Sequence, residues 1–188
     1  MNRCPWAGSP LLMEYHDTEW GRFTRDDRVH FEHLCLEGFQ AGLSWETVLK
    51  KRENLRRLFA GFDWNAVASF DQPRIESILL DPGGIRNRAK VRSVVNNASR
   101  LVELHRTGGT FAGLLLELLG GGPIVHAFTS LSQIPATTPE AVAVSKALKK
   151  LGYSFVGPTI IYAHLQATGL VNDHLVDCFV REEIERAG

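Results

Sequence analysis

Two short stretches near the opposite ends of the chain each carry one cysteine and one histidine. Cys4 and His16 lie near the start, and His174 and Cys178 lie near the end. The four-residue step from His174 to Cys178 places both side chains on one face of a predicted helix. A thiolate and an imidazole there form half of a tetrahedral zinc site, and the N-terminal pair is a candidate for the other half. The residues alone leave open whether they form one site or none.

Aromatic side chains gather in the first quarter of the chain, where Glu37 is placed to join them. Glu37 lies one step outside the apolar positions of its predicted helix, so its side chain can point into a cleft. The candidate walls of that cleft are Trp6, Tyr15, Trp20 and Trp45. Electron-rich rings with one convergent carboxylate suit a flat, hydrogen-bonding cation, such as a charged purine base. The alternative is that the tryptophans are core residues and Glu37 is a surface residue.

The stretch LLDPGGIRNRAK joins two predicted helices through a tight turn. Gly83 and Gly84 permit a positive φ and a close approach to the backbone. The next helix, expected to begin at Arg86, offers free N–H groups at its start, and Lys90 adds charge. Residues from about 73 to 105 therefore indicate a helix-hairpin-helix element that holds a DNA phosphate without reading the base sequence. Pro-Gly-Gly is also compatible with a plain turn.

The elements that must position these residues are helical, because the apolar spacing is helical nearly throughout. Helices are expected over residues 31–39, 44–60, 63–70, 72–80, 86–107, 110–119, 139–152 and 158–169, with a last one opening at Asn172 or Asp173. No convincing two-residue period and no internal repeat are found. The sequence therefore predicts an all-α fold over 1–188, as one unit or as two helical lobes around a cleft.

The composition is that of an ordinary soluble globular protein, with 44% hydrophobic and 22% charged residues. No apolar run is long enough to span a membrane, and the start has no apolar core of a secretory signal, so a cytoplasmic protein is expected. Three cysteines argue against a disulfide framework and cannot supply a four-cysteine iron–sulfur site; Cys35 is expected to be a buried thiol. The net charge of zero does not by itself indicate nucleic acid.

Several long stretches together resemble the bacterial type I 3-methyladenine DNA glycosylases of the helix-hairpin-helix superfamily. They are EYHDTEWG, LCLEGFQAGLSWETVLKKRENLRRLF, GGIRNRAKV and SKALKKLGYSFVGPTIIYAHLQATGLVNDH. They occur in order over nearly the whole chain, which is more specific than any single motif. The resemblance implies an enzyme that flips a 3-methyladenine nucleotide out of alkylated double-stranded DNA and hydrolyses its N-glycosidic bond.

The resemblance also implies a role for each candidate residue. Glu37 is the candidate catalytic residue and would hydrogen-bond the flipped base, which leaves open whether it acts chemically or only recognises the base. Tyr15 and Trp45 would stack around the base, and Trp6 and Trp20 would form further walls. Methylation at N3 leaves the base cationic, which the rings and the carboxylate favour, and the same charge makes it a good leaving group. Less catalytic help is then needed than for a neutral base.

The DNA-contacting residues implied by the resemblance are Leu43, as a wedge filling the gap left by the base, and Gly83, Gly84, Arg86 and Lys90. Most of the superfamily uses an aspartate after the hairpin, but no aspartate lies between Asp81 and Asp173. Lys90 could be a Schiff-base lysine, but its basic neighbours favour phosphate contact, so no lyase activity is expected.

The resemblance implies one structural zinc ion per chain, held by Cys4, His16, His174 and Cys178, with no open position for substrate water. The expected product is free 3-methyladenine, and the expected protein is a monomer without membrane contact, associated with the bacterial nucleoid when acting. Three alternatives stay open: a zinc-stapled DNA-damage binder without turnover, a bifunctional glycosylase/lyase, and a helical adaptor.

Overall fold

The computed structural model describes residues 2–187, so residues 1 and 188 of the predicted unit lie outside the described part. Its helices are α1 (Pro10–Thr18), α2 (Asp27–Gln40), α3 (Trp45–Leu58), α4 (Trp64–Ala68), α5 (Gln72–Leu80), α6 (Arg88–Arg106), α7 (Phe111–Leu118), α8 (Pro139–Lys150), α9 (Pro158–Ala167) and α10 (Phe179–Ala187), with short 3-10 turns η1 (Ala60–Phe62) and η2 (Leu131–Gln133). The predicted helical fold is confirmed. No helix among residues 2–187 is both long and apolar enough to cross a membrane.

Side-chain caps set most of the helix starts. Ser44 accepts a hydrogen bond from Thr47 N (3.1 Å) at the start of α3, as its position in the sequence predicts. Asn87 accepts from Lys90 N (3.1 Å) and so starts α6 at Arg88, two residues later than expected. Arg86 therefore belongs to the turn before α6 and not to the helix.

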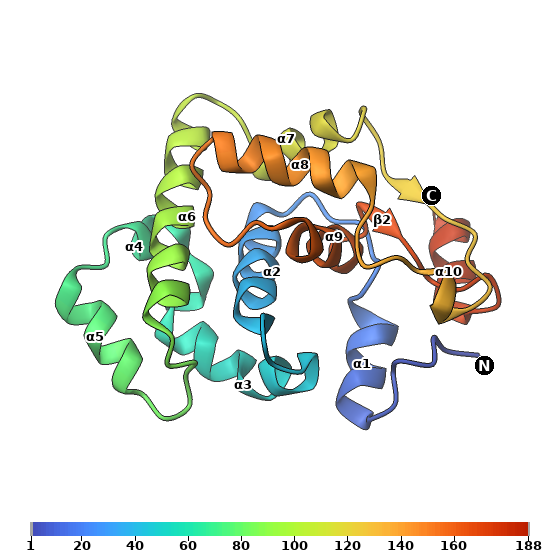
Figure 1. Cartoon of the computed structure of the whole chain (residues 1–188), viewed down its shortest axis with the longest axis horizontal. Coiled ribbons are helices and arrows are strands. Elements are labelled where there is room, and N and C mark those ends of the chain that lie inside the picture. The colour runs from blue at the N-terminus through green and yellow to red at the C-terminus, as the bar shows by residue number, and fades with distance from the viewer. Residues whose placement is uncertain (1, 188) are drawn as a thin grey trace.

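Helix α2 is the central element, buried along most of its length and packed against α9 (Figure 1). The larger apolar cluster surrounds it and includes Phe31, Phe39 and Phe59, all fully buried. A smaller cluster joins the two ends of the chain, where α1 and α10 lie on the same side of the molecule (Figure 1). Trp45 and Ile134 pack against both clusters, so the region between the clusters is where a cleft can form.

Two very short strands depart from the purely helical expectation. β1 (Ile124–Val125) pairs in parallel with β2 (Val171–Asn172), with Ile124 opposite Val171. Two residues are too few to produce a readable alternation of apolar and polar side chains. The pairing nonetheless places the residues after β1 beside those after β2.

The helix expected to open at Asn172 or Asp173 begins at Phe179 instead, which is a correction. The Asn172 side chain accepts a hydrogen bond from His174 N (3.1 Å), and Cys178 N donates to Leu175 O (2.9 Å). These local bonds hold residues 173–178 as a non-helical segment with one turn at residues 176–177, because short polar side chains offer the backbone an alternative to a helix. His174 and Cys178 are therefore not on one helical face, and this segment brings them together.

Candidate functional site

A cavity of about 360 Å³ lies between the two apolar clusters. Ten residues line it: Trp6, Tyr15, Trp20, Glu37, Gln40, Trp45, Leu131, Ile134, Ala163 and Gln166. All five residues predicted for the pocket from the sequence are among them. A concave, largely apolar site with a few converging polar groups is typical of a small-molecule or base-binding pocket.

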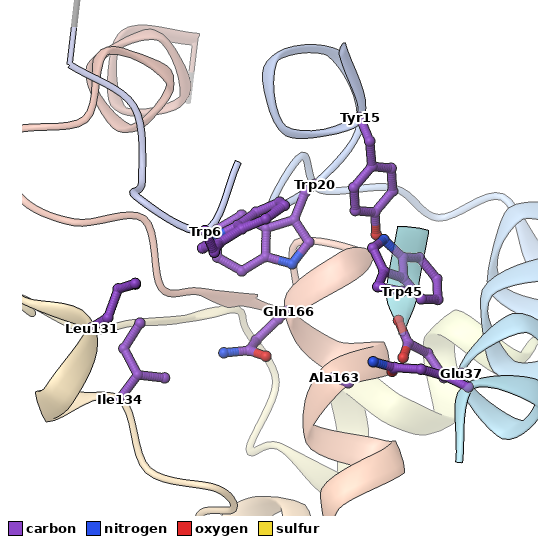
Figure 2. A pocket seen from close by; sticks show the side chains of 10 residues that line it. Trp6, Tyr15, Trp20, Glu37, Trp45, Leu131, Ile134, Ala163 and Gln166 are labelled. Carbon is purple, nitrogen blue, oxygen red and sulfur yellow. The ribbon is translucent and has the colours of Figure 1, made fainter. Parts of the chain in front are cut away.

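Aromatic rings form two sides of this pocket (Figure 2). The ring centroids of Trp6 and Trp20 are 5.0 Å apart in an edge-to-face arrangement. Those of Tyr15, on α1, and Trp45, at the start of α3, are 5.3 Å apart. Figure 2 shows the Glu37 carboxylate close to the Trp45 side of the space. A flat ring entering here would meet aromatic surface and one acidic group.

Glu37 lies near the end of α2 and is only 5% exposed. Burial raises the pKa of its carboxyl group from 4.5 to about 8, because a charge is disfavoured away from water. The Tyr15 hydroxyl and the Trp45 Nε1–H are also buried, and neither finds a hydrogen-bond partner within residues 2–187. Buried polar groups without partners are rare in native proteins, so these donors indicate a ligand that accepts hydrogen bonds.

Half of the pocket was not identified from the sequence. Leu131 and Ile134 come from η2 and the residue after it, and Ala163 and Gln166 lie three residues apart on α9. Apolar and amide side chains carry no local signal of a site, and only tertiary packing places them here. For α9, the spacing of three residues is the one signal that both side chains share a face.

The four candidate metal ligands converge behind the pocket. All four are buried, and their ligand atoms lie within 4.8 Å of one another. The Cys178 Sγ atom is 3.5 Å from His16 Nε2 and 3.5 Å from His174 Nδ1, and Cys4 Sγ is 3.6 Å from His174 Nδ1. Tetrahedral zinc with Zn–S bonds of about 2.3 Å and Zn–N bonds of about 2.0–2.1 Å separates S and N by about 3.6 Å. The donor set therefore fits such an ion.

The other ring nitrogen of each histidine has its own acceptor. His16 Nδ1 is 2.8 Å from the Asp17 carboxylate, and His174 Nε2 is 2.9 Å from the carbonyl oxygen of Trp20. An N–H that donates to these oxygens leaves His16 Nε2 and His174 Nδ1 free to bind a metal. The Trp20 ring also packs edge-on against His174, with centroids 4.6 Å apart. The cluster thus directly supports a wall of the pocket.

Four of the five predicted DNA-contacting residues lie in two loops, and Lys90 lies in the first turn of α6. Leu43 is 41% exposed, in the break between α2 and α3. Arg86 is exposed in the turn between α5 and α6. Gly83 N donates to Asp81 Oδ1 (2.8 Å) and Gly84 N to Asp81 O (3.2 Å), so these two amides, expected to face a phosphate, are already used within the turn.

Lys90, also expected to contact phosphate, is buried, which corrects that prediction. Its Nζ donates to the carbonyl oxygens of Phe39 (2.8 Å) and Ala41 (2.5 Å), at the end of α2. The ammonium group satisfies carbonyls that the helix end leaves unpaired. Burial lowers the pKa of Lys90. The sequence placed Lys90 correctly in the first turn of α6 but could not show that this turn faces α2.

A helical body with a buried carboxylate in an aromatic pocket is typical of a protein that binds a flat, hydrogen-bonding ligand. The family model described as methyladenine glycosylase matches residues 6–182. DNA-3-methyladenine glycosylase 1 of Escherichia coli (strain K12) is 46% identical over 95% of this chain and 96% of its own. The chain belongs to the methyladenine glycosylase family, and it is an enzyme, a DNA glycosylase that hydrolyses N-glycosyl bonds.

Solved structures agree with the sequence relatives. A crystal structure of 3-methyladenine DNA glycosylase I superposes with a TM-score of 0.92 at 45% identity, covering 95% of this chain and 98% of its own. The enzyme from Staphylococcus aureus, solved to show the structural basis of 3-methyladenine recognition, superposes with a TM-score of 0.90 at 32% identity, with 96% of each chain covered. The predicted helical glycosylase fold is thereby confirmed, whereas the zinc site that was expected to join the termini stays a prediction.

Proposed function

We propose that this enzyme removes 3-methyladenine from alkylated double-stranded DNA by hydrolysis and releases the free base. The observation that carries the proposal is the buried Glu37 in a pocket with aromatic walls and two unpartnered donors. A flat cation with ring nitrogens that accept hydrogen bonds would satisfy all of these groups at once. The related enzymes carry the name of the same lesion, which supports this choice of base.

The chemistry asks little of the protein because the leaving group is already positively charged. As the bond between N9 and C1′ breaks, its electron pair moves to the base and cancels the charge. Water adds to C1′ and loses a proton to solvent. The ionised form of Glu37 would stabilise the cationic base, and the rings would favour it over a neutral base. Glu37 is therefore proposed to recognise the base, and recognition of the cation selects the lesion.

The extrahelical nucleotide requires a wedge and a backbone contact. Leu43 is proposed as the wedge because it is apolar, exposed and adjacent to the helix that carries Trp45. Arg86 is proposed to contact a phosphate, with Gly83 and Gly84 allowing a close approach. A side chain at position 83 would collide with Asn54, since a Cβ there would lie 2.4 Å from Asn54 Nδ2.

The four-residue Cys/His cluster is proposed to hold one structural zinc ion. All four ligands come from the protein, so the ion would supply cross-linking of the two ends of the chain and no reactive water. Residues 1–188 are proposed to act as one unit and as a monomer, on DNA in the bacterial nucleoid. Release of the base in repeated turnovers would distinguish this enzyme from a protein that only binds damaged DNA.

We also propose that the enzyme is monofunctional. The Lys90 ammonium donates to two carbonyl oxygens and is absent from the pocket lining, which disfavours it as a Schiff-base nucleophile. The test uses methylated duplex DNA with and without the protein. Release of free 3-methyladenine without borohydride-trapped protein–DNA adduct is the expected result. No release would favour the binder, and a trapped adduct would show lyase chemistry.

A further inference from the structure

A fully buried carboxylate lies directly behind the pocket wall formed by α9. Pairing of β1 with β2 brings His126 beside Asp173, and His126 Nδ1 is 2.6 Å from Asp173 Oδ1. Asp173 Oδ2 accepts hydrogen bonds from the Tyr162 hydroxyl and from Gln166 Nε2, the latter at 2.7 Å. Asp173 is 0% exposed, so it acts only through these neighbours. Of the three, Gln166 alone also lines the pocket.

These contacts decide which end of the Gln166 amide faces the base. Gln166 Nε2 donates to Asp173 Oδ2, so the NH₂ group of the amide faces Asp173 and its oxygen points the other way. Burial and the hydrogen bond from its hydroxyl raise the pKa of Tyr162, so that hydroxyl keeps its proton and also donates. The Gln166 amide oxygen makes no hydrogen bond to the described residues, and Figure 2 shows it on the side toward Glu37.

We propose that Asp173 is a positioning residue that fixes Gln166 as a hydrogen-bond acceptor, and that Gln166 thereby selects a 6-amino purine over a 6-oxo purine. This inference rests on the proposed function, because it assumes a purine in the pocket. The exocyclic amine of adenine donates and can satisfy Gln166 Oε1. A carbonyl at the same position would place two acceptors face to face, which is unfavourable.

The Asp173 carboxylate matters because the side-chain amide of a glutamine can otherwise adopt either of two orientations. A half-turn about its last bond would present NH₂ to the pocket and accept a 6-oxo base equally well. The backbone of Gln166 is held as well, since its carbonyl accepts from Gly21 N (3.1 Å). With both backbone and amide fixed, turning the amide would break the hydrogen bond to Asp173 and set its oxygen against a carboxylate. The pocket then discriminates against a 6-oxo base because that base leaves hydrogen-bonding groups of the pocket unpaired.

The test compares two free bases, 3-methyladenine and 3-methylhypoxanthine, which differ in the substituent at position 6 and, as a consequence, in the proton on N1. Binding is followed by the fluorescence of the pocket tryptophans. The parent is expected to prefer 3-methyladenine at least tenfold. Gln166→Met should reduce that preference at least fivefold. Asp173→Asn, whose new amide can donate to Gln166 Oε1, should reduce it at least tenfold by gaining affinity for the 6-oxo base. Tyr153→Phe is the matched control, since Tyr153 OH is buried without a partner in the described chain.

A purely structural role would weaken both bases by the same factor, and an unchanged preference in Gln166→Met would overturn the inference. Metal content and thermal unfolding are measured for Asp173→Asn, because His174 is its neighbour. If Asp173→Asn loses its metal, its change in base preference is not counted, and the preference of Gln166→Met alone tests the inference. A parent that binds neither base contradicts the proposed function itself. A parent that binds 3-methyladenine without preference contradicts only this inference.

Discussion

At the scale of single residues, Glu37 combines two properties that conflict in an empty pocket. Its carboxyl group is buried, which raises its pKa to about 8, yet a cationic base requires the ionised form. Binding of the cation resolves the conflict because an adjacent positive charge favours the carboxylate. The pocket should therefore bind a charged base better than its neutral counterpart, and the difference should depend on pH.

The first prediction concerns the pH dependence of activity. In the free enzyme, kcat/KM should rise between pH 6.5 and 9 with an apparent pKa near 8, because only ionised Glu37 recognises the cation. Glu37→Gln should lose this rise together with most of its activity. Initial rates of base release on methylated DNA, corrected for spontaneous loss, measure both. A parent profile that is flat over this range would contradict the assignment.

The second prediction concerns stability at the same residue. A carboxyl group with a raised pKa binds its proton more tightly in the folded protein, so it favours folding at low pH. The free energy of unfolding should fall as pH rises from about 4.5 to about 8 and then level off, by as much as a few kcal/mol. Urea unfolding at pH 5, 7 and 9 tests this. Glu37→Gln should flatten the decline and be more stable than the parent at pH 9.

At the scale of elements, the hairpin between α5 and α6 divides its basic residues between two tasks. Lys90 points inward and binds the carbonyl oxygens at the end of α2, whereas Arg86 is exposed in the turn. Their order in the sequence gives no sign of this division. The first turn of α6 supports the end of α2, just before the loop that carries Leu43.

The third prediction separates these tasks. Lys90→Met leaves the buried carbonyl of Phe39 and the partly buried carbonyl of Ala41 unpaired, and should lower the free energy of unfolding by about 1–3 kcal/mol. Arg86→Ala should leave stability within about 0.5 kcal/mol of the parent and lower the salt dependence of DNA binding by about one phosphate contact. Denaturant unfolding and DNA affinity at several salt concentrations measure the two effects. Loss of the salt dependence in Lys90→Met, with unchanged stability, would contradict the structure.

The helices and the pocket aromatics were predictable because their signals are local. Ser44 caps α3 as expected, and Glu37 on α2 lines the pocket together with the aromatic side chains, as the sequence predicts. The burial of Lys90 and the conformation near the end of the chain were not predictable, because both depend on residues that are distant in the sequence. Residues 173–178 are non-helical, with the Asn172 side chain accepting from His174 N, and Lys90 is buried against α2. Gln166 could not be identified because its role depends on the carboxylate of Asp173.

At the scale of the whole molecule, the Cys/His cluster connects the two ends of the chain with the pocket. Cys4 and His16 come from the N-terminal segment, and His174 and Cys178 from the non-helical segment before α10. The ring of Trp6 packs against His16, with centroids 5.3 Å apart, so one pocket wall rests on the cluster. Stability and base binding should therefore be coupled through this site.

The fourth prediction is that loss of the proposed zinc ion affects both properties. Cys178→Ser should lower zinc content from one per chain, reduce stability by several kcal/mol and weaken binding of 3-methyladenine. Cys35→Ala serves as the control and should leave the zinc content unchanged. Alanine is chosen over serine because the Cys35 thiol is buried in the core. Elemental analysis and thermal unfolding measure the outcome. A parent protein purified without stoichiometric zinc would contradict the zinc assignment.

The most direct test of the central claim is release of 3-methyladenine from methylated duplex DNA by three proteins. These are the parent, Glu37→Gln, and Glu103→Gln, whose carboxylate is exposed on α6. The parent and Glu103→Gln should release the base at equal rates. Glu37→Gln should be about 100-fold less active, since it loses a charge-assisted contact with the cation. Equal release by all three would contradict the claim that the Glu37 pocket recognises the base.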